Sequence, residues 1–193
     1  MRPRNMNMIR SFVAVNIPEI VRNELAGIER QLKSRCGDVK WVRPESLHMT
    51  LKFLGNVDPG GLDAISRVLE RSAVSLAAFS LVLGGLGRFP HSGAPRVIWV
   101  GVREGAEQLK GLAASVETAL MTRGFEREKR PFSPHLTLGR VRMPKSASGM
   151  DEAIREIDYM SEPFTVAEFS LMRSDLLPSG ARYSVIHSVQ LKG

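Results

Sequence analysis

Two stretches of the sequence repeat each other: residues 44–51 read PESLHMTL, and residues 131–138 read PFSPHLTL. Five of the eight positions are identical, including a histidine, a threonine two residues later and a leucine directly after it. The chain has only four histidines, and chance placement predicts about 0.1 His-x-Thr sequences over its whole length. Two copies within a longer repeat therefore indicate a pair of related half-sites.

The spacing within each copy is typical of a β-strand with one buried face. Side chains two residues apart project from the same face of a strand, so His48, Thr50 and Lys52 are predicted to share a face. In the second copy, His135 and Thr137 share a face in the same way. The residues between them are apolar. We expect two strands that bury their apolar side chains and bring two imidazoles and two hydroxyls to opposite sides of one pocket.

The rest of the chain alternates between strand-like and helix-like segments. Strands are expected at residues 11–17, 39–42, 47–54, 79–86, 96–102, 134–141, 164–173 and 182–190, and helices at 19–36, 62–76, 104–123 and 147–159. Because strands often follow one another directly, we predict an α+β fold with largely antiparallel sheet. No linker interrupts the pattern, so residues 1–193 are interpreted as a single domain, with residues 1–9 as a dispensable extension.

The composition narrows the class of protein. The chain has 193 residues, of which 43% are hydrophobic and 24% are charged, as in a globular domain with a substantial core. Its 27 Lys and Arg against 20 Asp and Glu give a net charge of +7, which favours a phosphate-bearing or polyanionic partner. The single cysteine, Cys36, excludes an internal disulfide framework and multi-cysteine zinc sites. No segment reaches the length of a membrane span, and we expect a soluble, cytoplasmic protein.

The repeated residues suit the cleavage of a phosphodiester bond. Attack by water needs a base for the nucleophile and an acid for the departing oxygen, and histidine can serve in either role near neutral pH. The threonine hydroxyls can donate to the non-bridging oxygens, and Lys52 can neutralise developing charge. Arg130, in the basic segment 123–145, is the best further candidate for a phosphate contact. The alternative is that all of these are polar residues on a solvated strand face.

Other kinds of site have less support in the sequence. His-x-Thr lacks the second nitrogen or carboxylate of a close ligand pair, so we expect no metal. Ser133 has no orienting group or nucleophile-elbow pattern that would make it a nucleophile. His91 and His187 lie outside the repeat and are interpreted as ordinary surface or strand residues.

The repeated motifs resemble those of the two-histidine phosphoesterase superfamily, and specifically the RNA 2′,3′-cyclic phosphodiesterases, also called 2′-5′ RNA ligases. Residues 10–14 (RSFVA) are similar to the opening strand of that family, and residues 41–55 (WVRPESLHMTLKFLG) to its first motif block. Residues 131–140 are similar to its second block and residues 171–183 to its closing segment. The resemblance covers nearly the whole chain after the first nine residues.

That resemblance implies a bilobal α+β fold with pseudo-twofold symmetry and both histidines in a central cleft. It implies hydrolysis of an RNA-terminal 2′,3′-cyclic phosphate to a 2′-phosphate without metal or cofactor, with His48 as proton donor and His135 as proton acceptor. The reverse reaction would join RNA ends through a 2′-5′ bond. The expected partner is RNA with a cyclic phosphate end, such as a tRNA fragment, and we expect a monomer. Two alternatives stay open: a non-catalytic RNA-binding module, and a cyclic phosphodiesterase acting on small nucleotides.

Overall fold

The computed structural model describes residues 8–143, 149–178 and 180–193. In this part of the chain the strands form two sheets, one of four strands in the order β3-β1-β8-β9 and one of five in the order β2-β6-β5-β4-β7. All strand pairs within them are antiparallel, which confirms the predicted fold class. The strands are β1 (Ile9–Asn16), β2 (Val39–Trp41), β3 (His48–Val57), β4 (Phe79–Phe89), β5 (Val97–Glu104), β6 (His135–Val141), β7 (Phe164–Val166), β8 (Glu168–Leu177) and β9 (Gly180–Gln190).

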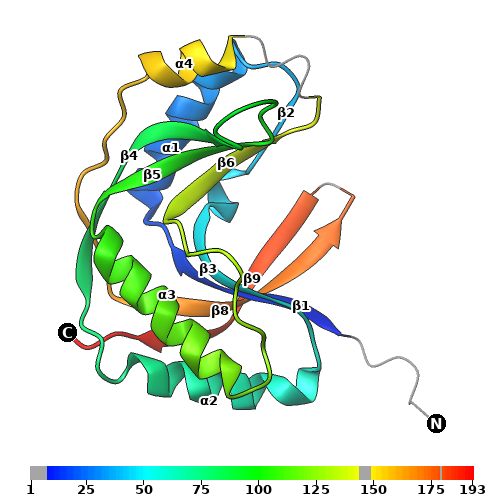
Figure 1. Ribbon diagram of the computed structural model, residues 1–193, viewed down its shortest axis with the longest axis vertical. Coiled ribbons are helices and arrows are strands. Elements are labelled where there is room, and N and C mark those ends of the chain that lie inside the picture. Colours follow the sequence, from blue (N-terminus) through cyan, green and yellow to red (C-terminus); the bar gives the residue numbers. More distant parts are fainter. Residues whose placement is uncertain (1–7, 144–148, 179) are drawn as a thin grey trace.

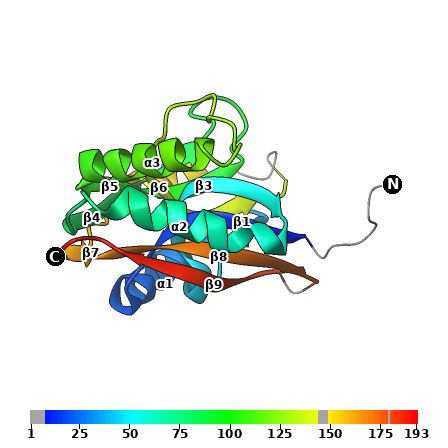
Figure 2. The ribbon, with the colours of Figure 1, turned by 90° about the horizontal axis from the view of Figure 1, so that it is seen from below.

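Each sheet is covered on one side by a pair of helices. α2 (Leu62–Ala73) and α3 (Ala106–Met121) lie against the four-stranded sheet, and α1 (Glu19–Lys33) and α4 (Met150–Glu156) against the five-stranded sheet (Figure 1). The view from below shows α2 and α3 side by side outside β1, β8 and β9 (Figure 2). The molecule therefore has two lobes, each a sheet with its own helices, as the resemblance implied.

The sequence of α1 explains why this segment is helical. Val21, Leu25, Ile28 and Leu32 are buried and recur at helical spacing, so they form one apolar stripe. An acidic residue lies in the first turn and basic residues in the last, which suits the helix dipole. The helix begins directly after Pro18, whose fixed φ and missing N–H are tolerated at a helix start.

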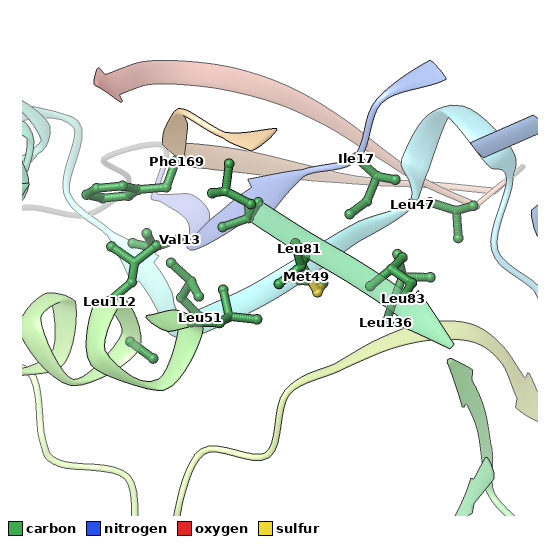
Figure 3. Packing of buried hydrophobic residues seen from close by; sticks show 14 of the residues in the cluster. Val13, Ile17, Leu47, Met49, Leu51, Leu81, Leu83, Leu112, Leu136 and Phe169 are labelled. Atoms are coloured by element: carbon green, nitrogen blue, oxygen red, sulfur yellow. The ribbon is translucent and has the colours of Figure 1, made fainter. Parts of the chain in front are cut away.

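One continuous core joins the two lobes. Val13 on β1 and Met49 on β3 belong to the same buried cluster as Leu83 on β4 and Leu136 on β6 (Figure 3). All four side chains are fully buried. Because densely packed interiors resist deformation, the strands that carry the two motifs are fixed relative to each other by the residues that alternate with the histidines and threonines.

The predicted shared face of Lys52 is wrong, because a β-bulge interrupts β3. Thr50 pairs with Ala14 and Lys52 with Val13, so Leu51 is an extra residue between two adjacent partners on β1. A bulge of this kind exchanges the faces of the residues that follow it. Lys52 therefore joins the core side with Val13 and is only 3% exposed.

Most of the predicted segments are present, with shifted ends. The strand expected at 164–173 is two strands, β7 and β8, and the last strand begins at Gly180. β1 begins at Ile9, so the proposed extension is shorter than nine residues, and residues 1–7 lie outside the described part. The last helix begins at Met150, and residues 147 and 148 of the expected helix also lie outside it. Among the described helices, none combines the length and apolarity needed to cross a membrane.

Candidate functional site

His48 is the first residue of β3 and directly follows a short turn. The turn is a 3-10 helix over Pro44–Ser46, which Pro44 favours at its first position. Its backbone brings the carbonyl oxygen of Ser46 to 2.7 Å from Nδ1 of His48. A carbonyl oxygen only accepts, so Nδ1 carries the hydrogen and donates it. The other ring nitrogen, Nε2, is the one left for chemistry.

The second histidine is held in the same way. His135 is the first residue of β6, and its Nδ1 lies 2.7 Å from the carbonyl oxygen of Ser133. The donor is again Nδ1 and the remaining nitrogen again Nε2. Both copies of the repeat therefore use the residue two positions before the histidine to fix its tautomer. The identical serines at these positions, 46 and 133, contribute their main-chain oxygens.

Aromatic side chains surround His48. The ring centroid of Phe12 lies 4.8 Å from that of His48, and the ring of Tyr183 meets it edge-on at 4.9 Å. Burial among these groups lowers the pKa of His48, and the hydrogen bond to Ser46 offsets part of this effect. A lower pKa makes the protonated ring a stronger proton donor.

His135 has its own aromatic neighbours on the other lobe. Phe89 meets it edge-on at 5.1 Å, and Trp99 lies at 6.5 Å. Trp99 is held there by close packing against Gly87, where any Cβ would collide with the indole ring. These aromatic neighbours were not predicted from the sequence, because alternation along one strand does not reveal which strands become neighbours.

The two motif strands are neighbours in space. β3 and β6 lie in contact, and Met49 and Leu136 are buried in the same cluster between the lobes. The threonines, at positions 50 and 137, are half-buried on the same strands. Within the described residues, neither hydroxyl makes a hydrogen bond to the protein, so both remain available as donors.

Lys52 lies apart from the histidines in a buried polar network. Its Nζ donates to the carbonyl oxygen of Glu126 at 2.8 Å and to Oε1 of Glu117 at 3.2 Å. The same carboxylate accepts the backbone N–H of Glu128 at 2.7 Å. This N–H, together with the Lys52 ammonium, lowers the pKa of Glu117. Lys52 thus links β3 to the loop that leads toward β6, and its ammonium is already paired.

Arg130 lies at the end of that loop and is exposed. It lines two hollows. One, of about 480 Å³, extends over Lys52, Phe53 and residues 125–130. The other, of about 680 Å³, is lined also by Phe89, Pro90, His91, Ala94, Arg96 and Val97. Within the described part of the chain, Arg130 makes no side-chain hydrogen bond or ion pair, so its charge is available to a ligand.

The two histidines outside the repeat, which were interpreted as ordinary residues, have different neighbours from the motif histidines. Nε2 of His187 on β9 lies 2.8 Å from Oε1 of Glu70 on α2. His91 lies in the loop between β4 and β5 and lines the larger hollow. No three or more His, Cys, Asp and Glu side chains gather into a possible metal site among the residues that the structure describes.

Known proteins resemble this chain over most of its length. RNA 2′,3′-cyclic phosphodiesterases from Methanothermobacter thermautotrophicus and Archaeoglobus fulgidus are 37% and 40% identical to it, over 91% of this chain and 95% and 96% of theirs. The crystal structure of Escherichia coli LigT complexed with 3′-AMP matches with a TM-score of 0.79 and 27% identity, covering 97% of this chain and 100% of that one. The model of the 2′-5′ RNA ligase superfamily matches residues 18–176, and the chain belongs to that superfamily.

Proposed function

We propose that this protein hydrolyses the 2′,3′-cyclic phosphate at the end of an RNA to a 2′-phosphate. The observation that carries the proposal is the pair of His-x-Thr strands, packed against each other, in which both histidines have Nδ1 bound to a carbonyl oxygen at 2.7 Å. Two imidazoles with the same free nitrogen can act as an acid and a base on one phosphorus. The relatives named as RNA 2′,3′-cyclic phosphodiesterases support RNA as the substrate.

The proposed step moves two protons and exchanges one P–O bond. Nε2 of His135 takes a proton from water while the water oxygen attacks phosphorus. The bond from phosphorus to O3′ breaks, and Nε2 of His48 gives its proton to O3′. The product carries a 3′-hydroxyl and a 2′-phosphate. The hydroxyls of Thr50 and Thr137 donate to the non-bridging oxygens, where negative charge grows, and Arg130 attracts the phosphate.

The surroundings of His48 fit the acid role. Burial lowers its pKa, so the proton it carries is more easily transferred to the leaving oxygen. An anionic phosphate beside the ring favours the charged form, so substrate binding would load the proton that the reaction then uses.

The same chemistry runs with another nucleophile. A 5′-hydroxyl in place of water would form a 2′-5′ phosphodiester bond, the ligation after which the superfamily is named. We further propose a monomer that acts in the cytoplasm on RNA ends, tRNA fragments among them. The unpaired, buried thiol of Cys36 suits a reducing compartment.

The deciding experiment is incubation with an RNA oligomer that ends in a 2′,3′-cyclic phosphate, followed by identification of the terminal phosphate. We expect a 2′-phosphate as product, at a rate that a chelator leaves unchanged, because the acid, the base and the hydrogen-bond donors are all side chains. His48→Ala and His135→Ala serve as controls. RNA binding without turnover would favour a non-catalytic binding module, and turnover of small cyclic nucleotides alone would change the substrate class.

A further inference from the structure

The larger hollow is built from aromatic and basic side chains. Phe89 and His91 form one wall, with ring centroids 5.2 Å apart and an edge-to-face arrangement. Arg96 and Arg130 supply two positive charges. Neither guanidinium has a side-chain hydrogen bond or ion pair within the described residues. Aromatic faces bind nucleobases by stacking, and unpaired arginines bind phosphates, so this chemistry matches a nucleotide.

The hollow is linked to the surroundings of His135 through Phe89. Phe89, which lines the hollow, meets the ring of His135 edge-on at 5.1 Å. The aromatic groups around His48, namely Phe12 and Tyr183, belong to the other lobe. Each histidine therefore has its own aromatic surroundings, and only those of His135 continue into this hollow.

In-line displacement at phosphorus places the leaving oxygen and the nucleophile on opposite sides. With His48 as the acid for O3′, the ribose that carries the cyclic phosphate lies on the His48 side. The nucleophile lies on the His135 side. A water molecule fills only a small part of a hollow of about 680 Å³. A larger nucleophile that fits there is the 5′-hydroxyl end of a second RNA.

We propose that this hollow binds the first nucleotides of a 5′-hydroxyl RNA and presents that hydroxyl to His135. A base of the second strand stacks on Phe89 and His91, and its first internucleotide phosphate contacts Arg96. The inference rests on the proposed function, and it adds a binding site for the acceptor of the ligation reaction.

The ligation step balances without any energy-supplying cofactor. The 5′-oxygen attacks phosphorus and its proton passes to Nε2 of His135. The P–O3′ bond breaks, and O3′ takes the proton of His48. One cyclic ester bond is exchanged for one 2′-5′ bond, so water and the 5′-hydroxyl compete for the same phosphorus. The ratio of ligated to hydrolysed product then reports on the occupancy of the hollow.

The test measures this ratio with adenosine 2′,3′-cyclic phosphate as donor and a short 5′-hydroxyl RNA, labelled at its 3′ end, as acceptor. We expect His91→Ala to lower the ratio about tenfold, as loss of a stacking partner does. Arg96→Gln should lower it about threefold or more and reduce the salt dependence of acceptor binding. Arg67→Gln, which removes the same charge from the exposed surface of α2, serves as the matched control.

Donor hydrolysis without acceptor should stay within about twofold of the unmodified protein in all three variants, since neither His91 nor Arg96 belongs to the proposed acid–base pair. A parallel anisotropy titration with the labelled acceptor should show weaker binding for His91→Ala and Arg96→Gln alone. Equal losses of hydrolysis and ligation would place the donor in the hollow and overturn the inference. A ratio of ligated to hydrolysed product that His91→Ala leaves unchanged would overturn it as well. Hydrolysis without acceptor binding or ligation would also overturn it while leaving the proposed function intact. Absence of hydrolysis would instead refute the proposed function.

Discussion

Replacing Lys52 by methionine is expected to lower the free energy of unfolding by about 2–3 kcal/mol. The side chain is 3% exposed, and its Nζ bonds the carbonyl of Glu126 at 2.8 Å and Glu117 at 3.2 Å. Breaking a buried ion pair costs about 3–5 kcal/mol when the remaining charge has no partner. Glu117 keeps the N–H of Glu128 and is partly exposed, so the expected loss is smaller. Methionine preserves the length and apolar stem of the side chain, which limits the loss of packing.

Urea unfolding followed by circular dichroism measures this change, and for a chain of this size it corresponds to a fall in Tm of about 4–12 °C. Glu117→Gln, alone and combined with Lys52→Met, should reveal a coupling energy of about 1 kcal/mol or more. Lys110→Met is the matched control, because Lys110 pairs with Glu107 on an exposed helix face, where such pairs contribute at most about 1 kcal/mol. The reasoning is refuted if Lys52→Met costs no more than Lys110→Met, or if its effect and that of Glu117→Gln simply add.

His48→Ala and His135→Ala should each lower kcat about 10²- to 10⁴-fold on a cyclic phosphate RNA with Tm unchanged within a few degrees; a folded variant with normal turnover would contradict the two-histidine mechanism. Burial lowers the pKa of His48, so as the pH rises the ring loses its proton earlier than an ordinary histidine does. With His48 as the acid, the midpoint of the alkaline fall in kcat/KM should lie below about pH 6.5 in the free enzyme. Tyr183→Ala should admit water to the ring of His48, raise its pKa and move the alkaline fall in kcat/KM to higher pH. NMR titration of the His48 ring measures that pKa directly, and a pH profile that does not move with it would contradict the acid role of His48. Gly87→Ala should displace Trp99 from its place near His135 and lower kcat/KM, while circular dichroism shows the fold retained.

Alternation along the chain was sufficient to predict the faces of four motif residues. The strands are regular from His48 to Thr50 and from His135 to Thr137, so the period of two holds over these residues, and burial of the residue between each pair enforces it. It failed at Lys52 because the bulge depends on the register between β3 and β1. Register is a property of two strands, and a pattern read along one of them does not contain it.

The aromatic surroundings of the histidines could not be predicted for a related reason. Phe12 and Tyr183 reach His48 only because the sheet order β3-β1-β8-β9 joins the first strands to the last. The hydrogen bonds from Nδ1 to the main chain could not be predicted either. Identical serines at positions 46 and 133 suggest a role for the serine hydroxyls, but the atoms that accept the hydrogen bonds are the backbone oxygens. The sequence predicted the two candidate histidines, and contacts that it does not reveal fix the tautomer of both rings and lower the pKa of His48.

The central place of β1 in the four-stranded sheet has a consequence for biosynthesis. β1 can pair with β3 early, but its other edge waits for β8, one of the last strands made. An open strand edge invites pairing with other chains, and contacts between distant segments close slowly. The lobe that carries His48 is therefore translated first and completed last. A nascent chain stalled before Glu168 would present the unpaired edge of β1 to the solvent, and such chains are the ones expected to need a chaperone or to aggregate.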